Sequence, residues 1–215
     1  MSSAEQLNDP NGAAPPARSL KQDIVRVAIE LGTELGEDGL TMRGIASRLG
    51  VSATALYQHF DGKSSILRAI RFHGLESMNE SLRPAFEKSD AMASIRDCVA
   101  RYIEFGRANP WLYDVLFVKG EVDYDQLDPD EKAVVSYPQD RLKAAFLSAK
   151  QAGQVRPDVD VETAPFLLWG AAHGLTCLMI SGRISAKHPS FPTGDEAKFA
   201  ENFVELAVRG FVANR

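Results

Sequence analysis

The chain has 215 residues, of which 45% are apolar and 25% charged, with a formal net charge of −5. These proportions are typical of a globular protein with one large or two small domains, and they exclude collagen-like and wholly disordered chains. Cys98 and Cys177 form neither a disulfide framework nor a metal-type spacing. Because the sequence shows no membrane-length apolar run and no secretory signal, we expect a soluble, reduced, cytoplasmic protein.

The predicted elements are helices throughout, after an N-terminal arm. Residues 1–17 are rich in Pro, Gly, Ala and Asn, which predicts a disordered arm. From Ser19 onward apolar residues recur three and four positions apart, which indicates amphipathic helices, and strand-like alternation is nearly absent. The sequence therefore predicts an all-α protein with nine helices, at about 19–35, 41–49, 52–59, 62–82, 89–108, 110–118, 129–152, 160–182 and 194–212.

Side chains that can satisfy free N–H groups mark several helix starts. Ser19 with Gln22 and Thr193 with Glu196 are predicted capping boxes. Asn109 and Asp128 are predicted N-caps, each followed by a proline at the first helical position. Pro138 and Pro165 fall inside two of the predicted helices, where each would introduce a kink or mark a later start.

The segment 41–60, TMRGIASRLGVSATALYQHF, carries the strongest functional signal. Gly50 is placed to end one short helix in a left-handed conformation, and Ser52 can cap the next. Two short helices joined by a turn that contains glycine form a helix-turn-helix, whose second helix enters the major groove of DNA. The residues on the outward face of that helix, placed there by their i,i+4 spacing, are Ala53, Thr54, Tyr57 and Gln58.

Each outward residue suits a part of the DNA. Thr54 and Gln58 can hydrogen-bond bases, and Ala53 can touch a thymine methyl group. The residues suited to phosphates are Tyr57, His59, Lys63, Thr41 and Arg43. The alternative is an ordinary helical hairpin with polar residues on its solvent-exposed face. An exposed tyrosine beside small residues favours DNA binding.

The stretch from Ile24 to Ala69 resembles the DNA-binding domain of the tetracycline-repressor (TetR) family of bacterial transcriptional regulators. The resemblance is carried by a Gly-Leu-Thr entry, Ile-Ala, a Gly-Val-Ser turn, Leu-Tyr-x-His-Phe, and then Lys63 and Leu67. It implies a homodimer that binds a palindromic operator and releases it when a small molecule enters a second domain. The DNA contacts that it implies are Thr41, Arg43, Ser52, Ala53, Thr54, Tyr57, His59 and Lys63.

The same resemblance implies a DNA-binding domain at 18–64 and a ligand-binding and dimerisation domain at 65–215. Within the latter, Trp169, His173 and Gly174 form a Trp-x-x-x-His-Gly element that resembles one subgroup of the family. The apolar faces of the last two predicted helices would either fill the monomer core or form a four-helix interface in a dimer. We favour the dimer interface, because the two half-sites of an operator need two recognition helices. The dimerisation candidates are Gly170, Ala171, Gly174, Leu178, Phe203, Leu206 and Gly210.

We expect the effector pocket to be mostly apolar with a few polar groups. Its candidate residues, each with core packing as the alternative role, are His73, Cys98, Tyr102, Phe105, Trp111, Tyr113, Leu116, Phe117, Trp169, His173, Thr176 and Cys177. No catalytic or phosphate-loop motif occurs, so we expect neither an enzyme nor a cofactor. The acidic residues at 121–131 indicate a solvated loop and a helix start rather than a metal site.

Three alternatives remain open at this point. One is an enzyme or small-molecule carrier with an incidental helix-turn-helix, and the others are an activator and a ligand-independent nucleoid-type binder. The operator, the regulated genes and the effector are not specified by the sequence.

Overall fold

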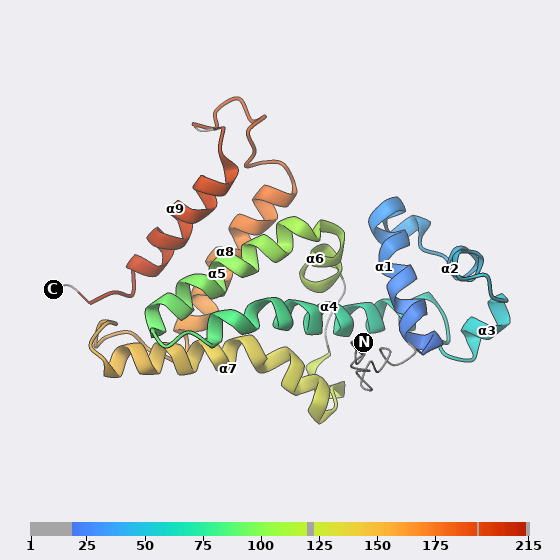
Figure 1. The fold of residues 1–215 in the computed structure, drawn as a ribbon, viewed down its shortest axis with the longest axis horizontal. Helices are drawn as coiled ribbons and strands as arrows, with labels where there is room; N and C mark the ends of the chain where they lie inside the picture. The colour runs from blue at the N-terminus through green and yellow to red at the C-terminus, as the bar shows by residue number, and fades with distance from the viewer. Residues whose placement is uncertain (1–18, 120–122, 193, 214–215) are drawn as a thin grey trace, which may run out of the picture.

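The computed structural model describes residues 19–119, 123–192 and 194–213, and these are almost entirely helical (Figure 1). Within them the helices are α1 (Leu20–Gly39), α2 (Met42–Leu49), α3 (Ala53–Tyr57), α4 (Lys63–Phe86), α5 (Ala91–Ala108), α6 (Pro110–Phe117), a 3-10 turn η1 (Tyr124–Gln126), α7 (Pro129–Gln151), α8 (Ala164–Ile180) and α9 (Glu196–Arg209). The described β pairing is one isolated bridge between Val155 and Val212. The predicted all-α fold is confirmed, and the predicted arm 1–17 lies outside the described residues.

Capping side chains fix two of the predicted starts. The Ser19 hydroxyl accepts a hydrogen bond from the backbone N–H of Gln22 at 3.3 Å, and the side-chain oxygen of Gln22 accepts one from the backbone N–H of Ser19 at 3.0 Å. Asp128 and Glu131 make the same reciprocal pair at the start of α7. Asn109 stands at the cap of α6 without a side-chain bond to that helix.

The predicted start of α9 is wrong in detail. The helix begins at Glu196, and Asp195 caps it by accepting from the Lys198 N–H at 2.9 Å. Thr193 lies outside the described residues. The α8 prediction is also too long at its start, because the helix begins at Ala164 with Pro165 in its first turn, where a missing N–H costs nothing.

Pro138 does not end α7 but changes its hydrogen bonding. A proline inside a helix has no N–H for the carbonyl four residues earlier, which here belongs to Val134. The side-chain amide of Asn79 on α4 donates to that carbonyl at 2.8 Å. The neighbouring helix therefore satisfies the group that the proline leaves free.

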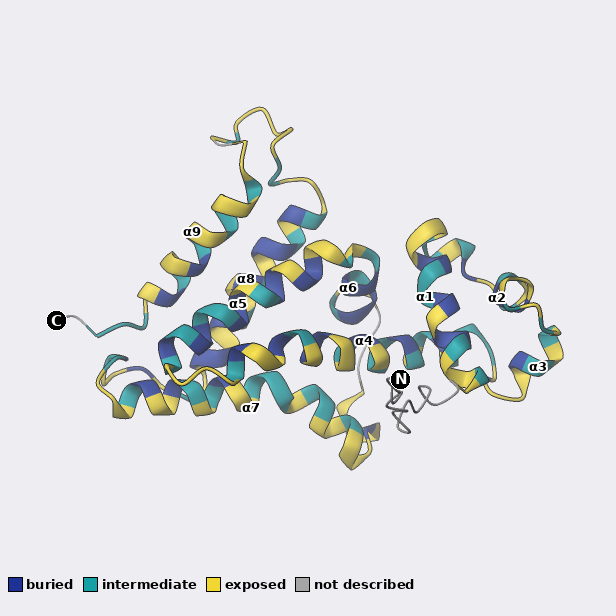
Figure 2. Ribbon diagram, in the orientation of Figure 1, coloured by how far each residue is buried: buried dark blue, intermediate teal, exposed yellow. Residues whose placement is uncertain are grey.

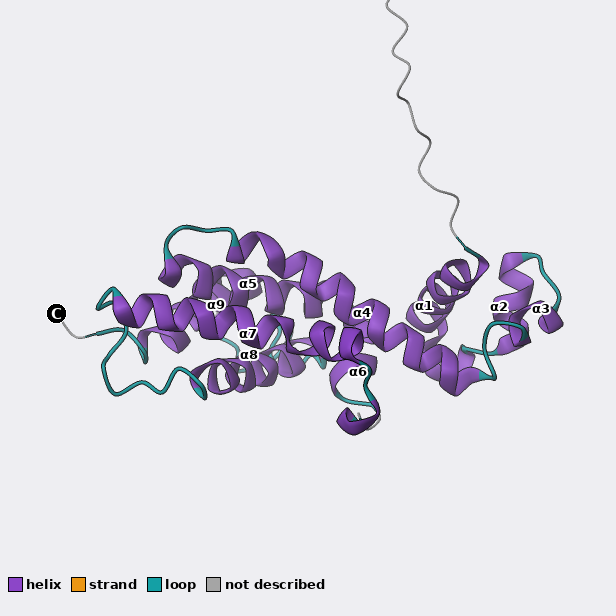
Figure 3. Cartoon of the chain, turned by 90° about the horizontal axis from the view of Figure 1, so that it is seen from below, coloured by secondary structure: helices purple, strands orange, loops and turns teal. Residues whose placement is uncertain are grey.

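Helix α4 joins two units of the molecule. Its 24 residues extend roughly 36 Å, from the N-terminal unit (α1–α3) into the C-terminal unit (α5–α9), where it packs against α5, α6 and α7 (Figures 1 and 3). Buried apolar faces of the helices meet inside both units (Figure 2). No helix in the described part of the chain is long and apolar enough to span a membrane.

Helix α6 packs against both units through two close approaches at glycines. A Cβ added to Gly32 of α1 would lie 2.1 Å from Cζ2 of Trp111, and one added to Gly74 of α4 would lie 2.9 Å from Cδ1 of Leu112. An ion pair of Lys119 with Glu37, 3.8 Å long, joins the end of α6 to the end of α1. The contact of α6 with α1 thus links the C-terminal unit to the N-terminal unit.

Candidate functional site

The first candidate site is the outer surface of α2 and α3. The Thr41 hydroxyl caps α2 by accepting from the Gly44 N–H at 3.0 Å, and the Ser52 hydroxyl caps α3 by accepting from the Ala55 N–H at 3.2 Å. Between them Gly50 has a φ of 68°, the left-handed conformation predicted for it. Both hydroxyls keep their O–H free to donate outward while they fix the two helix starts.

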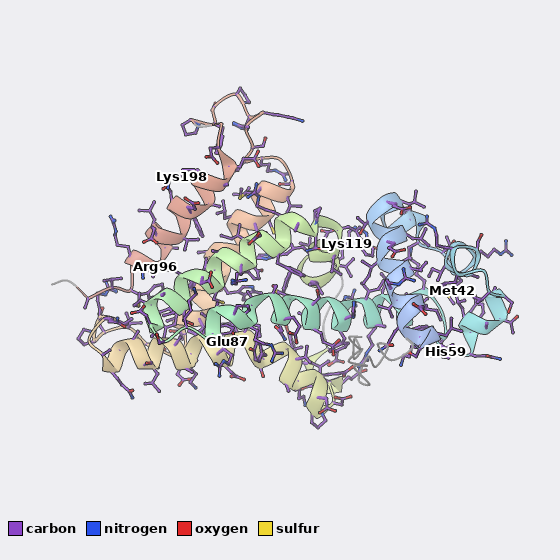
Figure 4. All side chains as sticks on the ribbon, viewed as in Figure 1. Met42, His59, Glu87, Arg96, Lys119 and Lys198 are labelled. Atoms are coloured by element: carbon purple, nitrogen blue, oxygen red, sulfur yellow. The ribbon has the colours of Figure 1, made fainter. Side chains whose placement is uncertain are left out.

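Helix α3 is anchored on one side and open on the other. Leu56 is fully buried in the N-terminal unit, whereas the Tyr57 side chain is 55% exposed. Thr54, Gln58 and His59 are exposed as well, while Ala53 is half-buried against the core. Figure 4 labels His59, which follows α3, and Met42, the first residue of α2.

The basic side chains nearby differ in their partners. Arg43 is exposed and has no ion pair with a described residue. Lys63 is half-buried, and its ammonium donates to the carbonyl oxygen of Glu37 at 2.5 Å, so it braces the end of α1 in this structure. Arg48 is paired with Glu34 at 2.8 Å. Arg43 is therefore the cation of the predicted set that is most readily available to a ligand.

The second candidate site is a cavity of about 630 Å³ between α4, α5, α7 and α8, which also reaches α6. This volume suits a small organic ligand. The predicted effector residues that line it are Cys98, Tyr102, Leu116, Phe117 and Trp169. His73 instead lies in a second crevice, of about 760 Å³, between α1, α4 and the start of α7.

The α4 wall of this cavity was not predicted from the sequence. None of the predicted effector residues belongs to the stripe by which α4 lines the cavity, which recurs every three or four residues: Arg68, Arg71, Phe72, Leu75, Met78 and Leu82. That periodicity was the available signal. Helix α7 adds Pro138 and Gln139, and the buried side-chain oxygen of Gln139 has no hydrogen-bond partner among the described residues.

A chain of hydrogen bonds runs from the cavity wall into α8. Trp169 donates through Nε1 to the Tyr102 hydroxyl at 3.0 Å, which lies 2.7 Å from the Tyr113 hydroxyl. The Tyr113 hydroxyl lies 2.7 Å from Nδ1 of His173. The indole can only donate, whereas each phenol hydroxyl can both donate and accept, so Trp169, Tyr102, Tyr113 and His173 form one hydrogen-bonded chain. On the other side of the ring, Nε2 of His173 lies 3.5 Å from the Cys177 sulfur.

Burial sets the protonation states around this chain. Desolvation lowers the pKa of His173 and raises the pKa of both Tyr102 and Tyr113. It also raises the pKa of Cys98 to about 12, so that the thiol remains protonated near neutral pH. Tyr102 and Cys98, the two of these groups that line the cavity, are therefore uncharged at pH 7 and can offer a ligand hydrogen bonds without charge.

The remaining predicted effector residues pack between helices and do not line the cavity. Thr176 is fully buried, and its methyl group occupies the space where Gly106 lacks a side chain. Trp111 packs on Gly32, as described above. The other predicted residues outside the cavity lining are Phe105, Tyr113, His173 and Cys177.

Helices α8 and α9 carry an apolar face that the described chain leaves open. The small residues Gly170, Ala171 and Gly174 are exposed on α8, beside Leu167 and Leu178, which are 65% and 41% exposed. On α9, Leu206 is 66% exposed; Gly210, just beyond the helix, is exposed, and Phe203 is half-buried. A face of this kind allows another helix to approach closely.

Potential metal ligands are scattered. Within 19–119, 123–192 and 194–213, no three His, Cys, Asp or Glu side chains lie where they could hold one ion. Cys98 and Cys177 are both free. Glu121, from the acidic segment, lies outside the described residues.

Comparisons with known proteins agree with this architecture. A profile of bacterial regulatory proteins of the tetR family matches residues 24–70, and a profile of the tetracyclin repressor-like C-terminal domain matches residues 95–204. The class A tetracycline repressor from transposon 1721 of Escherichia coli is 49% identical over 47 residues. That match spans 22% of this chain and 22% of the repressor, well below two thirds of its length.

Solved structures resemble the chain over nearly its whole length. A protein of unknown function from Rhodococcus sp. RHA1 has a TM-score of 0.74 at 21% identity, covering 96% of this chain and 100% of that one. The regulator FadR from Bacillus subtilis, solved in complex with stearoyl-CoA, has a TM-score of 0.68 at 18% identity, covering 88% and 98% of the two chains. At these identities the likeness concerns the fold.

Proposed function

Since this chain belongs to the TetR family of bacterial regulatory proteins, we propose that it is a cytoplasmic repressor of transcription that binds a palindromic operator as a homodimer and releases it when a small molecule occupies the cavity. In this proposal residues 18–64 are the DNA-binding domain and residues 65–215 the effector and dimerisation domain. The observation that carries the proposal is α3, which is anchored by Leu56 and presents an open face around Tyr57.

DNA binding would follow the division between base and phosphate contacts. Thr54 and Gln58 lie at the exposed face of α3, where they would meet base edges, while Ala53 would approach a thymine methyl group. Phosphates would be held at the flanks, by residues that combine exposure with a free donor: Thr41, Arg43, Ser52, Tyr57 and His59. Lys63 would first have to leave the Glu37 carbonyl.

A second copy of this chain is the occupant that we propose for the open face of α8 and α9. The glycines and alanine of α8 would let the two α8 helices pack closely, and Leu206 of α9 would be covered. A two-fold dimer would present two α3 helices, which must lie about 34–36 Å apart to reach successive major grooves. Dimerisation is therefore required for operator binding in this proposal.

Release of DNA would follow from contacts of α4 and α6. Both helices contribute to the cavity wall, and both contact α1 of the DNA-binding domain. A ligand that binds better when these helices are displaced would favour a separation of the two α3 helices that no longer fits DNA. We further assign the chain to the subgroup with the Trp-x-x-x-His-Gly element, because the hydrogen-bonded chain connects Trp169 with His173.

The direct test is binding to the DNA upstream of the chain's own coding region, with random duplex DNA as the control, over a range of salt concentrations. We expect a preference of roughly a thousandfold or more and an affinity that falls steeply with salt. No preference at any salt concentration, together with no site recovered by selection from a whole genome, would refute the regulator. Activation rather than repression would appear as increased transcription from the bound site.

Tyr57→Ala tests the recognition surface. We expect weaker binding to both operator and random DNA, because a phosphate contact is independent of sequence. The matched control is Tyr124→Ala, which removes a tyrosine that is 61% exposed in the effector domain. Unchanged operator affinity in Tyr57→Ala, or an equal loss in both variants, would remove Tyr57 from the interface.

A further inference from the structure

We propose that the effector is an elongated apolar acid, whose carboxylate binds Arg71 and whose hydrocarbon body lies along α4. This inference rests on the proposed function, in which the cavity is the effector site, and it adds the chemical class of the ligand. Three properties of the cavity support it: its length, its apolar middle, and a single cation that lacks a carboxylate partner.

The cavity is long in the direction of α4. Arg71 and Leu82 both line it and are eleven positions apart, which corresponds to roughly 16 Å along a helix. Between them α4 contributes the apolar residues Phe72, Leu75 and Met78. The other helices continue this apolar lining with Val99, Leu116, Phe117, Leu142 and Leu168. A slot of this shape fits an extended chain better than a compact polar molecule.

The charged groups around the cavity differ in their pairing. Arg68 is bonded to Glu131 at 2.8 Å, and Lys143 is paired with Glu162. Asp123 and Asp140 are exposed to solvent. Arg71 is half-buried and has no ion pair with any described residue. Among the cations that line the cavity in the described chain, Arg71 is thus the one whose charge is not matched by a carboxylate.

Arg71 is also held in position. Its Nε donates to the carbonyl of Val115 and one Nη donates to the carbonyl of Lys119, both at 3.2 Å. These bonds fix the plane of the guanidinium, and they leave the rest of its five N–H donors without a partner in the described chain. A carboxylate is the ligand group that matches such a planar donor in both geometry and charge. An ordered cation at one end of an apolar slot therefore favours a ligand with one acidic end.

The inference is tested by measuring dissociation constants calorimetrically for two probes of equal length, dodecanoate and dodecanol, below the concentrations at which they form micelles. We expect dodecanoate to bind at least tenfold more tightly, since a hydrogen bond to a charged group is worth roughly one to two powers of ten in affinity. Arg71→Gln should remove this preference and Arg71→Lys should keep part of it. The matched control is Arg83→Gln, which removes an exposed arginine from the same helix, outside the cavity.

The outcomes separate this inference from the proposed function. Equal binding of acid and alcohol, or a preference that Arg71→Gln leaves unchanged, would overturn the assignment of Arg71 and of an acid. Failure of both probes to bind would also overturn it. Operator binding is measured separately in each variant, so a chain that binds its operator but not dodecanoate would refute only the ligand class. Thermal unfolding of each variant checks that loss of the Arg71 bonds to α6 has not unfolded the domain.

Discussion

Replacing Gly32 with alanine should strain the contact between the N-terminal and C-terminal units. Gly32 is buried in α1, and an added Cβ would lie 2.1, 2.2 and 2.5 Å from three ring carbons of Trp111. Non-bonded carbons normally approach no closer than about 3.5 Å. The indole of α6 would therefore have to move by more than about 1 Å relative to α1.

The magnitude follows from two opposing effects. Alanine is about 1 kcal/mol better than glycine inside a helix, which favours the substitution. Overpacking a buried contact costs about 1–3 kcal/mol, and the rigid indole ring cannot bend out of the way. We therefore expect Gly32→Ala to lower the free energy of unfolding by about 1 kcal/mol, the difference between these two effects.

Trp111→Ala provides the matched background. Without the indole ring, Gly32→Ala should become stabilising by up to about 1 kcal/mol, because only the helix-propensity effect remains. The assay is urea unfolding of the four proteins of this double-mutant cycle, followed by operator binding of each. An equal effect of Gly32→Ala in both backgrounds would refute the reasoning, because the ring would then not be the cause.

Three further predictions concern single positions. Gly50→Ala should lower the free energy of unfolding by about 1–2 kcal/mol, because the φ of 68° is strained for alanine. Gly50→Asn should recover part of the lost stability, and an equal loss of stability in both variants would contradict the explanation. Gln139→Met should raise the free energy of unfolding by up to about 1 kcal/mol, because it removes a buried oxygen that has no hydrogen-bond partner among the described residues. A lower free energy of unfolding would mean that the side-chain amide of Gln139 does have hydrogen-bond partners in the folded protein. The wild-type protein should lose stability as the pH falls below about 6.5, because desolvation lowers the pKa of His173 and the unfolded chain binds more protons. His173→Gln should flatten that part of a urea-unfolding profile against pH, whereas parallel profiles would exclude His173.

The elements that local chemistry determines were predictable from the sequence. Gly50 ends α2 because that residue alone accepts the left-handed turn without a penalty, and Ser19 starts α1 through bonds within four residues. The N-cap of α9 was not predictable to the same precision. Asp195 and Thr193 both have side chains that can cap a helix, and the local sequence does not choose between them; in the structure Asp195 caps α9.

The cavity wall depended on information that local patterns do not contain. The stripe on α4 is visible as a period, but nothing in the pattern says whether it faces a cavity or a solid core. The contact between Gly32 and Trp111 joins residues almost eighty positions apart, and the placement of Tyr113 in a hydrogen-bonded chain required α5, α6 and α8 to meet. Residue type therefore suggested candidates for the effector site, and only the helix arrangement separated lining from packing.

The proline in α7 has a consequence for the speed of response. At Pro138 the missing N–H is a covalent property of the ring, and the Val134 carbonyl is already bonded to Asn79, so neither feature needs an occupant in the cavity. The α7 part of the cavity wall should therefore not have to rearrange when a ligand binds. Related ligands should then enter at similar rates and differ mainly in how long they stay, so that residence time determines which of them acts on transcription.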